Sequence, residues 1–455
     1  MLEDYAFLDN GVTFFLLFNC IGCVVSAMQI GRLLAFQRFV FLKPSVLVAA
    51  YSFLWFQLPL AAYSSYCEAT FKEPWGFAIL IHSLVLSGLF IGPLIAPKEA
   101  FEIWQRITHM RDEVARGSVG VLLSLSLLIV LFLIPYLWFV PLSSSGLYAI
   151  FFTPEVATIT REESFKVLEG ALPRYSYSFL SFALAPLCAV VLSQWFFSGL
   201  RRHNAQIIFL SSVGFFILLL ISSLTGERGR PVELLLVSLV AYMLRKGVPI
   251  KPVTIGVALS LVLAPATILS ILREGLELNF DLFMTYFEGI ILRAFRAPFE
   301  VASWHVQYVE DHGYWGVAGI PKLAALFGER ALNVNNIVGI HYLGFELDTV
   351  SAGTGYLFTQ HACFGFWILP ISILQLFFLD FALTILKRLS DYILLPSMSA
   401  IVVICLGFLQ SNYTTVLLSA GFGVVIVVSA LLSFFVCARP VKKGSPYGTP
   451  RAVPG

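Results

Sequence analysis

Charge is scarce in this sequence. Only 12% of its 455 residues are Asp, Glu, Lys or Arg, about half the share in a soluble globular protein, whereas 58% are hydrophobic and 42 are Phe. A chain of this composition has too few polar side chains to cover the surface of a soluble core. We therefore expect an all-α, polytopic integral membrane protein that forms a single membrane domain over residues 1–455.

Several signatures of soluble function are also missing. The sequence has no Walker loop, no glycine fingerprint for a dinucleotide and no basic patch for nucleic acid, so a cytosolic ATPase or a DNA-binding protein has no support. Its seven cysteines are spread along the chain and predict neither a disulfide framework nor a metal site. We expect no cofactor, no metal and no nucleic-acid partner.

Eleven apolar runs divide the chain. A helix of about 20 apolar residues crosses a bilayer, and charged residues separate the runs. They lie at about 11–31, 44–62, 75–95, 118–141, 177–199, 206–225, 231–244, 252–272, 357–384, 392–410 and 416–437. The seventh is short and the ninth is long, so about 11 transmembrane helices are predicted.

Lys and Arg alternate between the loops. Of the 29 cationic residues, 18 fall in every second loop or in the C-terminal tail, which places these segments on the cytoplasmic side. The acidic N-terminus then faces out and the Pro/Gly-rich tail at 438–455 is a disordered cytoplasmic segment. The longest inner loop, 96–117, is basic and amphipathic, and we expect it to lie on the anionic inner leaflet.

This topology leaves two large extracytoplasmic loops, at about 142–176 and 273–355, both expected to contain interfacial helices. The segment Thr160–Glu163 has the pattern of a capping box that starts one such helix. Subtracting 18 from 29 leaves 11 cations outside, and eight of these are Arg. Arg binds phosphate and carboxylate through two parallel hydrogen bonds, so an anionic ligand is indicated on the outer side.

Two outer segments concentrate this signal. In the first, Arg228 and Arg230 flank Pro231, which is predicted to be the first residue of a helix whose N-terminus would favour an anion. In the second, 293–300, Arg293 and Arg296 precede Pro298 and Glu300, and Pro298 is predicted to break or restart a helix.

A structural role is the alternative for each of these arginines. Arg near a helix end commonly extends to lipid headgroups. Arg296 and Glu300 are also spaced as an i,i+4 ion pair on a surface helix.

Four histidines lie in or near the outer segments and are possible proton acceptors: His305, His312, His341 and His361. None has a second histidine three or four residues away, so zinc is not expected, and a solvated or core position is the alternative for each. Glu346 and Asp348 form one acidic pair, a weak indication of a divalent cation.

The sequence between about 205 and 375 resembles the O-antigen polymerases of bacteria, the Wzy-type family of oligosaccharide repeat-unit polymerases. The resemblance rests on the turn Thr225–Arg228 before an apolar helix, on 292–300 at the start of the large loop, and on Asn333–Asn336 and 353–356 ahead of the next span. Some members carry a Gly eleven residues after an Arg in both large loops, but this chain has Leu172, Trp304 and Gln307 at the corresponding positions.

The resemblance implies an enzyme of the bacterial inner membrane with its active site on the periplasmic face. It would join undecaprenyl-pyrophosphate-linked oligosaccharide units without a metal, and its partners would include membrane lipids, a chain-length regulator and a repeat-unit flippase. Arg228, Arg293 and Arg296 are the candidates for stabilising the leaving pyrophosphate, and Glu300 and His305 for deprotonating the attacking hydroxyl. The candidate substrate-binding residues are Arg230, Arg161, Asn335, Asn336, His341 and Tyr286.

Two other functions are open. An O-antigen ligase, or another polyprenyl-linked glycosyltransferase, would use the same donor and the same outer arginines. A transporter of the lipid-linked sugar would need charged residues in the middle of its spans, where His82 is the clearest exception to an otherwise apolar pattern and Asp380 falls near an inner end.

Overall fold

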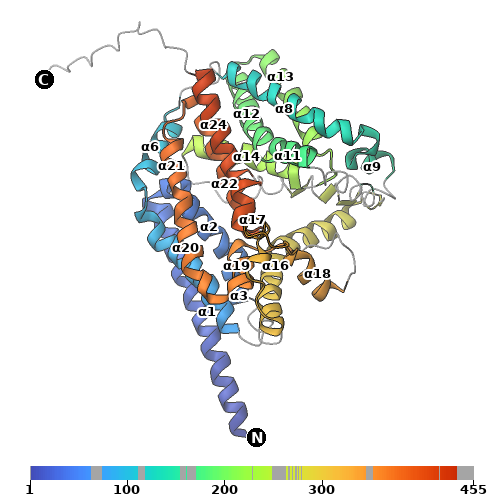
Figure 1. The fold of residues 1–455 in the computed structure, drawn as a ribbon. Coiled ribbons are helices and arrows are strands. Elements are labelled where there is room, and N and C mark those ends of the chain that lie inside the picture. The colour runs from blue at the N-terminus through green and yellow to red at the C-terminus, as the bar shows by residue number, and fades with distance from the viewer. Residues whose placement is uncertain are drawn as a thin grey trace, which may run out of the picture.

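The fold is helical throughout the part of the chain that the structure describes (Figure 1). This computed structural model describes residues 2–62, 74–110, 118–153, 171–227, 229–247, 279–344, 352–419 and 421–437, together with Thr160 and a few positions between 263 and 277. For 2–14, 74, 171, 172, 174 and 293–295 it describes the backbone alone. The expectation of an all-α protein is confirmed over these residues.

Nine helical segments of the described chain are long and apolar enough to cross a membrane, and each matches one of the eleven predicted spans. They are Phe15–Phe36, Pro44–Ala62, Trp75–Leu94, Val119–Phe139, Tyr175–Arg201, Ala205–Ser222, Tyr356–Leu386, Asp391–Leu409 and Tyr413–Phe435. The predicted run 231–244 is also helical, within α14 (Gly229–Lys246), but four charged residues lie near its ends. The run 252–272 lies mostly outside the described residues.

Three of these spans contain a π-helical turn, and each turn ends two residues before a proline. The turns are η2 (Phe53–Gln57), η3 (Ser87–Ile91) and η7 (Leu180–Leu184), followed by Pro59, Pro93 and Pro186. Proline lacks an N–H and its ring crowds the carbonyl four residues earlier. A wider turn relieves that contact, and the helix continues past Pro59 and Pro186, whereas after Pro93 it ends at Leu94.

Loops predicted to share a side of the membrane lie together. In two of the predicted outer loops, Leu147 N donates to Leu224 O (3.1 Å). Residue 146 in the same contact has to be glycine, because a Cβ there would lie 2.3 Å from Thr225 O. Lys322 Nζ donates to Thr414 O (3.4 Å), which joins another pair of predicted outer loops. The region from α16 (Phe280–His312) to α18 (Val334–Leu343) lies towards the same end as the N-terminus, and the C-terminus lies at the opposite end (Figure 1).

The amphipathic helix of the predicted inner loop, α6 (Pro97–Thr108), packs on the bundle. Its apolar residues Ala100, Ile103 and Ile107 are fully buried in the main hydrophobic core. Arg106 donates to the carbonyl oxygens of Lys387 (2.6 Å) and Leu389 (2.7 Å) at the neighbouring inner turn. The expectation that this helix rests on lipid is therefore wrong, because its apolar face is covered by protein.

The predicted break at Pro298 is also wrong. Helix α16 runs without interruption from Phe280 to His312, a length of 33 residues with Pro298 inside it. Phe299 and Ala302, just after the proline, are buried in the main core, and Phe299 packs edge-on against Phe77. This tertiary packing keeps the helix continuous, so Arg293 and Arg296 lie in its interior and not at a helix start.

A buried ion pair joins three spans near the predicted inner side. Lys43 Nζ and Asp380 Oδ2 are 3.2 Å apart and neither side chain is exposed. Asp380 also accepts hydrogen bonds from the backbone N–H (2.9 Å) and the hydroxyl (2.6 Å) of Ser45, so it caps helix α2 (Pro44–Ser52) from a distant part of the chain. Lys43 in addition donates to the carbonyl oxygen of Gly92.

We predict that Asp380→Asn destabilises the protein by about 3–5 kcal/mol, because it leaves the Lys43 ammonium buried without a counter-charge. Thermal unfolding of the purified protein in detergent measures the effect. The double variant Lys43→Met/Asp380→Asn should recover most of the loss, since the asparagine oxygen still accepts from Ser45. A single variant that unfolds at the wild-type temperature would contradict the prediction.

Candidate functional site

Arg230 is held by acidic neighbours at the start of α14. Its Nε donates to Glu227 Oε2 (2.8 Å) and its Nη1 to Glu233 Oε2 (3.0 Å), and its Cζ lies 3.8 Å from the ring centroid of Phe182. Only 17% of the side chain is exposed. Two carboxylates and an aromatic face already satisfy this guanidinium, so the contacts favour the structural role over anion binding.

The start of this helix also differs from the prediction. α14 begins at Gly229, two residues before Pro231, which is therefore the third helical residue. Arg228 and Arg161 lie outside the described residues, as does most of the predicted capping box Thr160–Glu163. For Arg293 the structure describes only the backbone, within α16.

A row of five side chains lies along one face of the C-terminal half of α16. Its members recur every four residues, so each lies about one turn beyond the last on the same side of the helix: Arg296, Glu300, Trp304, Tyr308 and His312. Arg296 Nε pairs with Glu300 Oε1 at 2.5 Å, which agrees with the i,i+4 alternative. Because the guanidinium is 48% exposed, it is still open to a ligand from outside.

Aromatic side chains of helix α18 (Val334–Leu343) pack against this row of α16 side chains. Tyr342 stacks on Trp304 with 8° between the ring planes, and His341 meets Tyr308 and His312 edge to face, both at 5.2 Å between centroids. Tyr308 stacks in turn on His312 (4.2 Å) and on Trp315 (5.3 Å). We call these six rings the aromatic ridge: Trp304, Tyr308, His312, Trp315, His341 and Tyr342.

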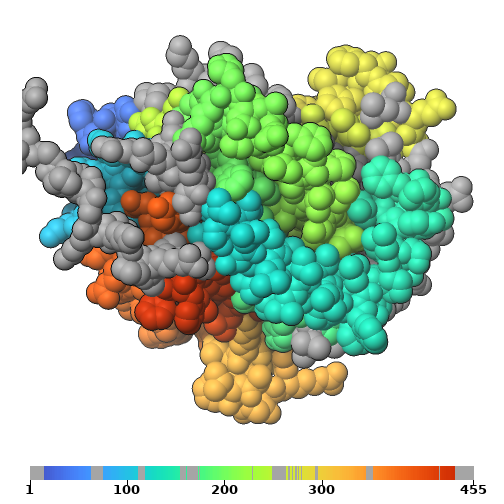
Figure 2. All heavy atoms as spheres, turned by 90° about the horizontal axis from the view of Figure 1, so that it is seen from above, coloured from blue at the N-terminus to red at the C-terminus, as the bar shows by residue number. Residues whose placement is uncertain are grey.

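The aromatic ridge lies at the edge of the molecule. His312 and His341 are exposed, while Trp304, Tyr308, Trp315 and Tyr342 are half-buried. Seen from above, the yellow and light-orange segments that include α16 and α18 project beyond the rest of the bundle (Figure 2). The arrangement offers stacked ring edges and faces next to two imidazoles, with the Arg296–Glu300 pair at one end.

One of the two exposed histidines, His312, has a hydrogen bond that assigns its ring nitrogens. His312 Nδ1 lies 3.0 Å from Tyr308 O, and a backbone carbonyl can only accept, so Nδ1 carries the hydrogen in this contact. The other ring nitrogen, Nε2, is then the unprotonated one in the neutral ring. His341 lies beside it although it is 29 positions away in the sequence.

His305, predicted as a base, lies on the inward side of α16. It is completely buried and its Nε2 donates to Ala352 O (2.8 Å), while Nδ1 has no partner among the described residues. Burial lowers the pKa of His305 from 6.5 to about 4, although the bond to Ala352 opposes this shift. The position matches the alternative of a core histidine, and no substrate atom can reach the ring without rearrangement.

The predicted substrate-binding residues are divided between several places. Asn335 and Asn336 lie in the first turn of α18, where the side chain of Asn333 accepts from Asn336 N (3.4 Å) as the helix cap. The backbone carbonyl of Asn335 accepts from Ala352 N (2.9 Å) and anchors the segment ahead of the next span. Tyr286 bonds to Glu274 and lies about 15 Å along α16 from Arg296.

The sequence reasoning missed most of the aromatic ridge. Trp304, Tyr308, Trp315 and Tyr342 were not selected, and His312 was named only among the four histidines. The four-residue recurrence from Arg296 to His312 was a visible signal for the α16 part. The contribution of α18 had no such signal, because it depends on how two helices pack.

No group of three His, Cys, Asp or Glu side chains in the described residues could hold a metal ion. Glu346 and Asp348, the predicted acidic pair, lie outside those residues. Cys20 and Cys23 have the spacing of a Cys-x-x-Cys motif, which the sequence reasoning did not take into account. Both are free thiols on α1 (Leu2–Phe36), and Cys23 Sγ donates to Gln57 O (3.3 Å).

Comparisons of this chain with protein-family models, with curated proteins and with solved structures found no match. The function therefore has to be inferred from the residues and contacts of the chain itself.

We predict that His305 makes the protein less stable in acid. The unfolded state binds a proton below pH 6.5 but the folded state only below about 4, so stability falls as pH decreases between these values, by about 3 kcal/mol in total. In His305→Gln the amide still donates to Ala352 O but does not titrate. Urea unfolding in detergent at several pH values should show a smaller acid loss for this variant, and equal losses would contradict the prediction.

Proposed function

We propose that this protein is a membrane glycosyltransferase that joins lipid-linked oligosaccharide units, in the manner of the O-antigen polymerases that its sequence resembles. The observation that carries the proposal is the aromatic ridge next to Arg296 and Glu300. It combines surfaces suited to a sugar, to a pyrophosphate and to a transferred proton on two neighbouring helices.

The rings are suited to hold the acceptor sugar. A pyranose has an apolar C–H face and a polar rim, and it packs with that face on an aromatic ring while its hydroxyls bond to polar neighbours. Trp304 with Tyr342 and Tyr308 with Trp315 provide two stacked pairs. A saccharide lying along α16 from these rings towards Arg296 would then place a hydroxyl near Glu300.

The proposed reaction needs one base and one anion site. Glu300, one turn from Arg296 and paired with it, takes the proton from the acceptor hydroxyl, the hydroxyl oxygen attacks the anomeric carbon of the donor, and the bond from that carbon to the pyrophosphate oxygen breaks. Arg296 is the described residue placed to stabilise the leaving pyrophosphate, with Arg293 one turn earlier and Arg228 as further candidates. Arg230 is not proposed as a pyrophosphate ligand, because Glu227 and Glu233 already pair with its guanidinium.

The proposed setting is the outer face of a bacterial inner membrane, with undecaprenyl-pyrophosphate-linked units as substrates. The alternation of Lys and Arg supports this orientation. An O-antigen ligase would use the same donor and is the second candidate. A transporter has less support, because Asp380, the acidic residue inside a described span, is occupied by Lys43 and Ser45 in a structural contact.

We predict that Glu300→Gln lowers the rate of polymerisation about 10²-fold or more, because it removes the proton acceptor next to Arg296. The assay uses purified protein and undecaprenyl-pyrophosphate-linked repeat units, with products separated on a gel. His305→Gln is the matched control and should form normal chains. If Glu300→Gln also forms normal chains at the wild-type rate, the proposed base is wrong.

A second prediction separates pyrophosphate binding from headgroup anchoring. Lys keeps the charge of Arg but not its planar pair of donors, so Arg296→Lys and Arg293→Lys should lose about 10²-fold in rate, as the Ala variants do. An arginine that merely extends to headgroups tolerates Lys. Normal chain formation by both Lys variants would remove these residues from the site.

A further inference from the structure

Two exposed histidines meet on the aromatic ridge. All seven histidines of the chain lie in its described part, and His312 and His341 are the two whose rings lie against each other, with centroids 5.2 Å apart. The spacing in the sequence argued against zinc, because no histidine has a second one three or four residues away. The fold supplies the second imidazole from another helix, 29 positions further along the chain.

The hydrogen bond of His312 has the pattern found at metal ligands. Its Nδ1 donates to Tyr308 O (3.0 Å), so Nε2 carries the lone pair in the neutral ring. A histidine that binds a metal through one nitrogen commonly donates its other N–H to a backbone carbonyl, which fixes the tautomer and the orientation of the ring. His312 therefore already has this outer hydrogen bond.

His341 lies at the edge of the His312 ring. Tyr308 and His312 stack with centroids 4.2 Å apart, and His341 is 5.2 Å from each of them and nearly perpendicular to both. Equal distances place His341 beside this stack and not at its end, so the edge of the His312 ring is directed towards it. The ring nitrogens, which are the metal-binding atoms of histidine, lie at that edge.

The distance between the rings suits one shared ion. Zinc and an imidazole nitrogen are about 2.0–2.1 Å apart when bound, so the centroids of two rings on one ion at a tetrahedral angle would be roughly 5 Å apart. His312 and His341 have centroids 5.2 Å apart. Both side chains are exposed, so small rotations can direct a nitrogen of each ring at the ion, and water can reach it.

We propose that His312 and His341 form a binding site for a divalent transition-metal ion, Zn²⁺ or Cu²⁺, on the predicted outer face, and that the ion joins α16 to α18. Imidazole suits both ions, and Cu²⁺ binds such sites more tightly. Two protein ligands leave positions for water or for a hydroxyl of a bound sugar. The site lies roughly 18 Å along α16 from Glu300, so the inference does not depend on the proposed enzymatic activity.

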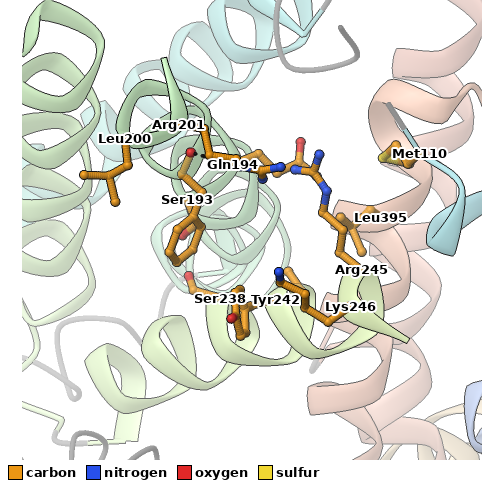
Figure 3. Close-up of a pocket in the computed structure, with 12 residues that line it drawn as sticks. Met110, Ser193, Gln194, Leu200, Arg201, Ser238, Tyr242, Arg245, Lys246 and Leu395 are labelled. Carbon is orange, nitrogen blue, oxygen red and sulfur yellow. Dashed lines mark hydrogen bonds between the residues drawn. The ribbon is translucent and has the colours of Figure 1, made fainter. Parts of the chain in front are cut away.

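The large cavity near the predicted inner end offers no such ligands. It has a volume of about 640 Å³ and lies between α12 (Ala185–Arg201), α14 and α22 (Asp391–Ile404). Figure 3 shows Arg201, Arg245 and Lys246 among its lining side chains. The residues that line it include no histidine, cysteine, aspartate or glutamate. We therefore expect one ion for each chain, at the histidine pair.

Equilibrium dialysis of the purified full-length protein against Zn²⁺, without a polyhistidine tag, tests the site. His312→Asn and His341→Asn should each weaken binding about tenfold or more, because even the loss of an outer hydrogen bond costs about 10–100-fold in metal affinity. His203→Asn is the matched control. It removes an exposed histidine from a predicted inner turn, and asparagine tolerates the left-handed backbone there (φ 51°).

Copper tests whether both rings bind the same ion. The electron paramagnetic resonance spectrum of Cu²⁺ on the wild-type protein should show splitting by two imidazole nitrogens. Zn²⁺ should also raise the unfolding temperature of the wild type but of neither single variant, because an ion held by both helices stabilises the folded state. The proposal is overturned if either variant binds Zn²⁺ like His203→Asn, or if wild-type Cu²⁺ shows one nitrogen.

Discussion

The buried ion pair between Lys43 and Asp380 is the contact on which the arrangement of the spans depends. A charge inside a membrane bundle is tolerated only when it is paired and hydrogen-bonded. Here each partner meets that condition with groups from elsewhere in the chain: Asp380 caps the helix that starts at Pro44, and Lys43 bonds to the carbonyl of Gly92. Three spans that are far apart in sequence are therefore held in one register near their predicted cytoplasmic ends.

Pairing also separates the structural arginines from the candidates for function. Arg106 bonds to Asp391 and to carbonyls of a neighbouring inner turn, whereas Arg230 pairs with Glu227 and Glu233 at the start of its own helix and lies against the ring of Phe182. Arg296 pairs with Glu300 and remains half exposed. The two ends of the molecule also differ: stacked rings and imidazoles occupy the predicted outer end, and a large cavity lies near the predicted inner end.

Prolines in this protein show how packing modifies the rule that a proline ends a helix. Pro59, Pro93 and Pro186 each follow a π-helical turn; the helix continues past Pro59 and Pro186, whereas after Pro93 it ends at Leu94. Pro298 lies inside α16, and burial of Phe299 and Ala302 keeps that helix continuous. A proline therefore indicates a local change of hydrogen bonding in a membrane helix, and the neighbouring helices decide whether the helix stops.

The sequence by itself determined the class of the protein, nine of the spans and the Arg296–Glu300 pair, because these follow from local composition and from spacing within one helix. Tertiary structure alone decided the rest. It turned His305 inward against Ala352, brought His341 to His312, and placed the ring of Phe182 against Arg230. The physical reason is that burial and pairing depend on which helix covers which face, and residues distant in the sequence supply those contacts.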